Sequence, residues 1–172
     1  IDISPVISEE IAVWPGDVPF VRNENLRISE GSNIDLSSIH TTVHLGAHTD
    51  APSHYLAEGE GIGDRDLSYY YGDAQVMHVD VGRGERIRQS HLTGSILAPR
   101  ILFRTGTYPN PNHFNPDFAS LSPSLIEWLA QEGVRLVGID TPSIDPAESK
   151  DLPSHAMVAA HNLAILEGIV LD

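Results

Sequence analysis

The sequence has no cysteine and no long apolar run, and these two absences exclude several classes of protein. Without cysteine the chain cannot form disulfides, thiol nucleophiles, cysteine-ligated zinc fingers or iron–sulfur clusters. No apolar stretch approaches the roughly 20 residues that a membrane-spanning helix needs, so we expect a soluble protein without a membrane partner. A chain free of cysteine also suits a reducing compartment, and we expect it to be cytoplasmic.

Positive charge is scarce as well, with 10 Lys and Arg residues against 24 Asp and Glu residues and a net charge of −14. Such a surface repels phosphate backbones, so we expect no nucleic-acid partner. The length of 172 residues and the 41% hydrophobic content are those of one globular domain. We therefore interpret residues 1–172 as a single domain.

The pattern of elements predicts an α/β fold. Residues 74–81, 100–104 and 134–139 have the composition of strands. Ser122 and Pro123 fit the N-cap and first position of a helix that Gly133 would end. We expect a mixed sheet, curled toward a barrel, with a few helices packed outside it.

Nine histidines are present, and the informative ones lie in residues 40–54, HTTVHLGAHTDAPSH. In an extended chain alternate side chains point to opposite faces. One face then carries His40, His44, His48, Asp50 and His54, and the other face is mostly apolar and is predicted to be core. A helix would also place His44 and His48 on one face, but Gly46, Pro52 and several β-branched residues favour the extended form.

A straight strand would separate His44 and His48 by about 13 Å, too far for two ligands of one ion. We therefore predict a sharp bend at Gly46, the residue best able to adopt one. Neutral imidazole and carboxylate groups suit Zn²⁺ or Mn²⁺. The alternative is a strand whose histidines simply face solvent.

A second set of donors is predicted in residues 154–168. In one unbroken helix His155 and Glu167 would lie about 18 Å apart. A short helix that ends near His161 and Asn162, followed by a turn into a strand, would return Glu167 toward His155. Ser154 is the expected cap of that helix. From the residues alone, the favoured interpretation is that His155 is an ordinary helix residue and Glu167 an ordinary turn acid.

The run from His44 to His54 resembles the HxGxHxDxPxH signature of the metal-dependent cyclase family, whose best-known members are bacterial kynurenine formamidases. Further segments that are similar to that family's are Asp2–Pro5, Trp14–Pro19 and Gly138–Ser143. The resemblance implies a swivelling β/β/α fold and a homodimer. Since chains of that family continue for some tens of residues, we also expect a C-terminal tail after Asp172 to be missing.

The resemblance also assigns site residues. It implies two divalent ions per chain, zinc with manganese as the alternative, and their ligands would be His44, His48, Asp50, His155 and Glu167. Asp50 and Glu167 would touch both ions, His54 would be the catalytic base, and Trp14 would contact the substrate. Trp14 could equally be a core residue. His161 is treated as structural, and His40, His78, His91 and His113 have no predicted role.

The function implied is hydrolysis of N-formyl-L-kynurenine to L-kynurenine and formate in tryptophan degradation, with hydroxide on the metal as the nucleophile. An isatin-hydrolase-like enzyme that opens a cyclic amide is the alternative within the family. A protein of another class, in which metal only staples a non-catalytic binding fold, is the third hypothesis. The segment pair has more carboxylates than a structural metal site needs, and His54 is a further histidine beyond the metal ligands, so an enzyme is favoured over this third hypothesis.

Overall fold

The computed structural model describes residues 1–171, and its centre is a four-stranded parallel sheet. The strands are β3 (Gln75–His78), β5 (Arg100–Arg104), β7 (Leu136–Ile139) and β8 (Ala164–Leu166), in the order β3-β5-β7-β8. The α/β prediction is confirmed, with the parallel and antiparallel ladders in separate sheets.

The remaining strands form two small sheets. β1 (Val21–Leu26) and β2 (Leu36–His40) make an antiparallel hairpin, whereas β4 (Arg86–Ile87) and β6 (Ser120–Leu121) pair in parallel. The described chain also has single-turn 3-10 segments at Ile28–Glu30, Ile62–Asp64, Leu67–Tyr69 and Gln89–His91.

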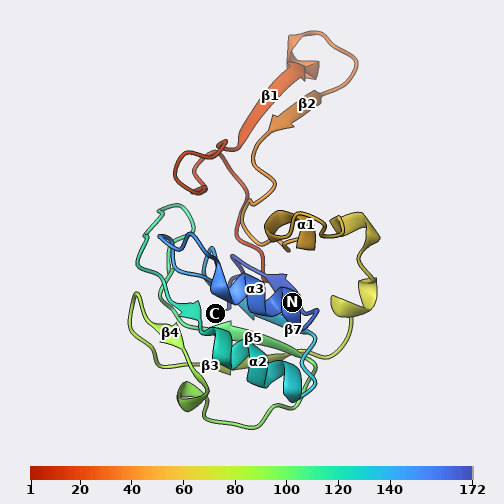
Figure 1. The fold of residues 1–172 in the computed structure, drawn as a ribbon. Helices are drawn as coiled ribbons and strands as arrows, with labels where there is room; N and C mark the ends of the chain where they lie inside the picture. The colour runs from red at the N-terminus through yellow and green to blue at the C-terminus, as the bar shows by residue number, and fades with distance from the viewer. Residues whose placement is uncertain (172) are drawn as a thin grey trace.

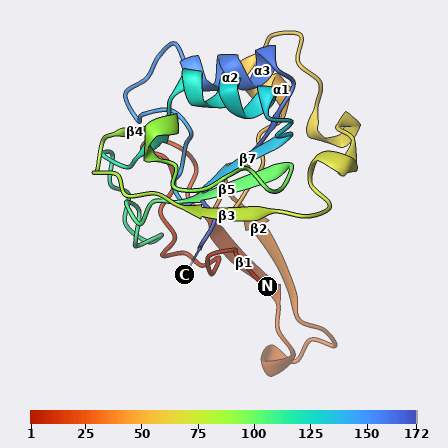
Figure 2. The ribbon, with the colours of Figure 1, turned by 90° about the horizontal axis from the view of Figure 1, so that it is seen from below.

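Three α-helices occur within residues 1–171: α1 (Pro52–Tyr55), α2 (Pro123–Gln131) and α3 (Pro153–Ala160). Figure 2 shows α2 and α3 side by side on one face of the sheet, with the β1–β2 hairpin on the opposite side. None of these helices is long and apolar enough to cross a membrane.

Helix α2 forms where the sequence predicts it. The Ser122 hydroxyl accepts a hydrogen bond from the Leu125 N–H at 3.2 Å, and Pro123 occupies the first helical turn. Gly133 follows the helix with a positive φ of +84°, which ends it. Leu125 and Leu129 are completely buried against the sheet.

The core lies on both faces of the parallel sheet. On the helix side, α2 and α3 pack over β5 and β7, whose Ile101 and Val137 are fully buried. On the opposite side a smaller cluster joins Leu102 and Leu136 to Ile169, just beyond β8. The strands are thus covered on both faces, as expected for a parallel sheet.

The histidine-rich segment differs from the extended strand that its alternation predicts. Only Leu36–His40 is a strand, and it belongs to a hairpin that projects away from the body of the molecule (Figure 1). The predicted apolar core face is wrong, because Ile39 is 66% exposed and Val43 is 86% exposed. Alternation indicated two faces, but no second layer covers the hairpin in the described chain.

The topology brings functional segments to one edge of the sheet. Because β5, β7 and β8 run parallel, their carboxyl ends meet, and ligands of open α/β sheets bind beyond this edge. Arg104 ends β5, Asp140 follows β7 and Glu167 follows β8. The histidine-rich segment 41–51 approaches the same edge from the hairpin side.

Candidate metal centre

Two stretches more than 100 residues apart are joined at the site by backbone hydrogen bonds. The His48 N–H donates to the Glu167 carbonyl at 3.0 Å, and the Glu167 N–H donates to the His48 carbonyl at 2.9 Å. Thr49 supports this pairing, because its hydroxyl donates to the Ile165 carbonyl at 2.6 Å. His48 and Glu167 therefore hold a fixed register across the two stretches.

Gly46 makes the bend that the sequence predicts. It has a left-handed φ of +57°, and the His44 and His48 rings on either side of it lie with their centroids 5.0 Å apart. Gly168 packs directly on this bend, also at a positive φ of +66°. A Cβ at Gly168 would lie 2.2 Å from the Gly46 carbonyl oxygen, so the approach requires glycine.

The first group of donors is His44, His48 and Asp50. Asp50 Oδ1 lies 3.0 Å from His44 Nδ1 and 3.6 Å from His48 Nε2. The His48 Nδ1–H donates to the Gly46 carbonyl at 3.0 Å, which leaves Nε2 free to accept a ligand. The bend at Gly46 thus sets both the position of the His48 ring and its tautomer.

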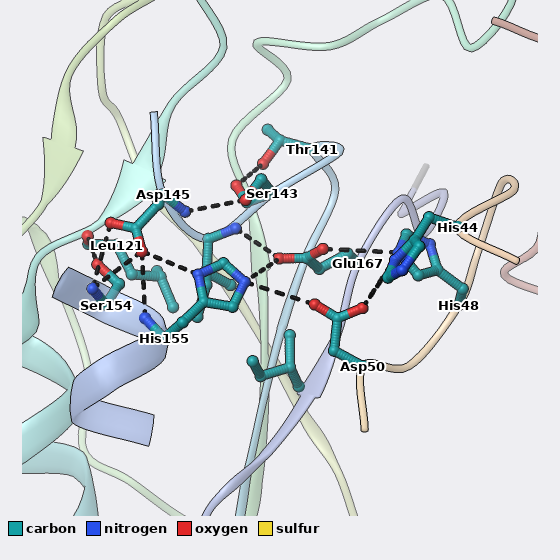
Figure 3. Close-up of polar contacts among 12 residues, drawn as sticks. His44, His48, Asp50, Leu121, Thr141, Ser143, Asp145, Ser154, His155 and Glu167 are labelled. Atoms are coloured by element: carbon teal, nitrogen blue, oxygen red, sulfur yellow. Dashed lines mark hydrogen bonds and ion pairs between the residues drawn. The ribbon is translucent and has the colours of Figure 1, made fainter. Parts of the chain in front are cut away.

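The second group is Asp50, His155 and Glu167, all of them buried. His155 Nε2 lies 3.4 Å from Asp50 Oδ2 and 3.7 Å from Glu167 Oε1. Glu167 Oε2 lies 3.6 Å from His48 Nε2, so each carboxylate presents one oxygen toward each group. Figure 3 shows Glu167 between His155 on one side and His44 and His48 on the other.

These side chains fit a pair of divalent cations. Two ligand atoms bound tetrahedrally to one zinc ion lie roughly 3.3 Å apart, similar to the donor separations in both groups. Asp50 Oδ1 is buried and has no hydrogen-bond partner among residues 1–171, as expected of an oxygen oriented for a cation. Imidazole and carboxylate donors are those that Zn²⁺ and Mn²⁺ prefer.

The pKa values follow from the close packing of these groups. Burial and the neighbouring Asp50 charge raise the pKa of Glu167. Burial would also raise the pKa of Asp50, but the His155 and His44 imidazoles outweigh it and lower that pKa. Burial opposes a charge on His155, yet Asp145 and Asp50 raise the pKa of its ring to about 9. Protons and cations therefore compete for the same buried donors.

A cavity of about 980 Å³ opens onto both groups of donors. His54, in α1, lines it with its ring centroid 4.2 Å from that of His44 and 6.4 Å from that of His155. Burial lowers the pKa of His54, which favours the neutral ring. His54 therefore lies beside the candidate ligands without belonging to either group.

Part of the cavity lining is aromatic. Trp14 lines it and packs edge-to-face on Phe114 and Phe118, with ring centroids 5.2 and 6.2 Å apart. Tyr108 and Phe114 also line the cavity. Trp14 is 37% exposed, so the interpretation of this residue as a core residue is wrong.

The predicted residues divide into those that line the cavity and those that lie elsewhere. All five predicted ligands, together with His54 and Trp14, line this one cavity, whereas His40, His78, His91, His113 and His161 do not. The prediction that Ser154 caps α3 is wrong, because the helix begins at Pro153, two residues before the predicted start, and Leu152 at the N-cap position provides no side-chain cap. The predicted break is confirmed: α3 ends at Ala160 and Asn162 has a φ of +53°.

Asp145 and Arg86 are not among the residues that the sequence predicts for the site. Asp145 is completely buried and lies 2.9 Å from His155 Nδ1, and Arg86 lies 3.0 Å from Asp145. The one signal for Asp145 in the sequence is its position five residues after Asp140, which itself directly follows a predicted buried strand. Arg86 carries no signal, because a single arginine on a two-residue strand is ordinary.

Comparisons with known proteins identify the family and the fold of this chain. The family model described as "Putative cyclase" matches residues 1–146. A structure described as a potential metal-dependent hydrolase with cyclase activity aligns with a TM-score of 0.81 at 24% identity, covering 100% of this chain and 82% of that one.

Two further structures have the same fold. A predicted metal-dependent hydrolase from Bacillus stearothermophilus aligns with a TM-score of 0.77 at 22% identity, covering 98% of this chain and 81% of that one. Isatin hydrolase A from Labrenzia aggregata, bound to benzyl benzoate, aligns with a TM-score of 0.83 at 18% identity, covering 99% and 80%. At these identities the likeness shows the fold.

Proposed function

Since this chain belongs to the cyclase family, we propose that it is a metal-dependent hydrolase that cleaves an amide bond beside an aromatic ring, specifically the formamide of N-formyl-L-kynurenine. The observation that carries the proposal is the convergence of three imidazoles and two carboxylates, with Asp50 common to both donor groups, in a cavity that aromatic side chains also line. A structural metal site would close its coordination sphere, whereas these donors border a cavity large enough for a substrate.

His44, His48 and Asp50 would hold one divalent ion, and Asp50, His155 and Glu167 the other. When bound, such ions would supply Lewis-acid chemistry, lowering the pKa of a bound water molecule and polarising the amide carbonyl. The protein contributes the fixed geometry: the backbone pairing of His48 with Glu167 orients the two groups toward each other. Gly46 and Gly168 permit the approach.

His54 is the proposed proton-transfer group. Its neutral ring lines the cavity beside His44 and belongs to neither group of metal donors. It can therefore accept a proton from water and deliver it to the leaving nitrogen. Asp50 is unsuited to this task, because its lowered pKa keeps it ionised.

The residues that line the cavity favour binding of an aromatic substrate that carries a carboxylate. The edges of Trp14, Tyr108 and Phe114 can pack on an anilide ring. Among the described residues that line the cavity, Arg104 is the only lysine or arginine. Its Nε–H donates to the Leu171 carbonyl, which fixes the guanidinium at the cavity edge, where it would bind the carboxylate of a kynurenine-like substrate.

Opening of a cyclic amide such as isatin is the second candidate, and the likeness to an isatin hydrolase favours it. The donor groups serve either reaction, because both begin with attack of water on an amide carbonyl. The two substrates differ in shape, so the aromatic wall and Arg104 decide between them.

One zinc-loaded preparation assayed in parallel against N-formyl-L-kynurenine and isatin tests the proposal. We expect faster release of formate than opening of isatin. Faster opening of isatin than release of formate would instead show that the cyclic amide is the preferred substrate. If neither amide is hydrolysed and chelation unfolds the chain, the metal only staples the fold and the proposal is wrong.

We also propose that the chain forms a homodimer through the β1–β2 hairpin. Every residue of both strands is exposed, including Leu36, Ile39 and Val21, and the hairpin projects from the body (Figure 1). An exposed apolar surface of this kind favours association. Sedimentation of the wild type and of Ile39→Lys should give a dimer and a monomer respectively; a monomeric wild type would contradict this proposal.

A further inference from the structure

A buried carboxylate lies behind His155, on the side away from the cavity. Asp145 is completely buried and does not line the cavity. Its Oδ2 accepts a hydrogen bond from the Nδ1–H of His155 at 2.9 Å and another from the His155 backbone N–H at 3.1 Å (Figure 3). Asp145 therefore contacts both the ring and the backbone of one candidate ligand.

Asp145 also provides the cap that α3 lacks locally. The helix begins after Leu152, which has a left-handed φ of 42° and makes no side-chain cap, and Pro153 has no N–H to donate. The free N–H of Ser154 donates to Asp145 at 3.0 Å from nine residues away. One carboxylate thus fixes the start of the helix and the ring of its third residue, His155.

Arg86 holds the carboxylate in place. It donates to Asp145 Oδ1 at 3.0 Å, to the Ser154 hydroxyl at 2.8 Å and to the Leu121 carbonyl at 2.7 Å. The guanidinium compensates a negative charge that would otherwise be buried near Asp50 and Glu167. With both oxygens occupied by these donors, Asp145 has no oxygen directed toward the cavity and cannot replace His155 as a ligand.

The contact decides which nitrogen of His155 reaches the donors. A ring that donates through Nδ1 to Asp145 presents Nε2 toward Asp50 and Glu167, 3.4 and 3.7 Å away. The equivalent contact of His48 is made by a backbone carbonyl, that of Gly46. The two groups of donors therefore depend on different supports.

From this arrangement we infer that Asp145, clamped by Arg86, is a positioning residue that fixes the tautomer and orientation of His155 and so sets the affinity of one of the two metal positions. The inference rests on the proposed function. The position formed by Asp50, His155 and Glu167 depends on Asp145, and the position formed by His44, His48 and Asp50 does not.

Zinc titration of the wild type and of Asp145→Asn tests this inference. Asparagine keeps an acceptor for the α3 N–H groups but loses one of the two carboxylate oxygens. We expect the wild type to bind two zinc ions, and Asp145→Asn to bind one ion as before and the other about 10–100-fold more weakly. Asp117→Asn is the matched control, because it removes an exposed partner of Arg83 and should leave both affinities unchanged.

A readout on the wild type keeps the inference testable if Asp145→Asn does not fold. Long-range ¹⁵N–¹H correlation spectra of the zinc-loaded protein should show His155 protonated at Nδ1 and ligated through Nε2, and ligation through Nδ1 would overturn the inference. Arg86→Lys, which keeps the charge but loses the paired donors, should weaken the same ion by a smaller factor.

The outcomes separate the two proposals. If the wild type binds no zinc, the proposed function fails and the inference fails with it. If the wild type binds two ions and Asp145→Asn binds both with unchanged affinity, or weakens both equally, only the inference is overturned.

Discussion

Replacing Gly168 with alanine should separate the two halves of the site. The new Cβ would lie 2.2 Å from the Gly46 carbonyl oxygen, whereas ordinary contacts begin at 3.4 Å, so the two backbones must move apart by about 1 Å. Gly168 directly follows Glu167, and Gly46 lies two residues before His48. Such a displacement therefore reaches two candidate ligands, whose positions a zinc ion tolerates to within about 0.2 Å.

The expected effect has two parts. An alanine at the φ of +66° costs roughly 1–2 kcal/mol of unfolding free energy, because a left-handed conformation strains any residue with a Cβ. The displacement should in addition weaken zinc binding by at least 10-fold. Zinc affinity is measured by competition with a chromophoric chelator, and the unfolding free energy is measured by urea denaturation of the same samples.

Gly133→Ala is the matched control. Gly133 has a similar φ of +84°, but a Cβ there would meet nothing within 4 Å, and the residue lies after α2 away from the cavity. It should show the loss of unfolding free energy without the loss of zinc affinity. If Gly168→Ala bound zinc as tightly as Gly133→Ala, the close approach of Gly168 to Gly46 would not control the site.

Three further predictions concern the donors and the cavity wall. His48→Ala should lose zinc and activity together, whereas His54→Ala should keep zinc and lose about 10²–10⁴-fold in kcat; loss of zinc from His54→Ala would refute this division of roles. Because the pKa of His155 is raised to about 9, its ring holds a proton that zinc must displace at neutral pH, so zinc affinity should rise between pH 6 and 9. Calorimetry in two buffers of different ionisation enthalpy would detect the released proton, and a flat pH profile would contradict the assignment. Arg104→Met should raise KM for N-formyl-L-kynurenine but not for formanilide, which lacks the carboxylate, whereas Trp14→Ala should raise KM for both by about 2–10-fold; equal KM values for mutant and wild type would remove these residues from the binding surface.

The sequence predicts part of the site from strong local signals, and the family resemblance adds His155 and Glu167 as ligands. His44, His48 and Asp50 share one short segment, and the need to bring the two rings together predicts the bend at Gly46. The return of Glu167 toward His155 follows from the helix-ending Asn162, and α2 follows from Ser122 and Pro123. In each case a covalent or steric constraint acts within a few residues.

Other features depend on contacts between distant segments, which one sequence does not reveal. Ile39 and Val43 alternate like core residues, yet both are exposed; Ile39 is exposed because the β1–β2 hairpin leaves the body of the fold. Serine is a residue type that commonly caps helices, but α3 is capped by Asp145, which lies nine residues before Ser154 and outside the helix. Burial and capping are decided here by tertiary packing, which overrides local preference.

The central claim is that two stretches of this chain jointly hold a pair of divalent ions. Elemental analysis of zinc per chain, after saturation with zinc and removal of unbound metal by gel filtration, tests it most directly. We predict two zinc ions per chain. A content of one or none would contradict the binuclear centre.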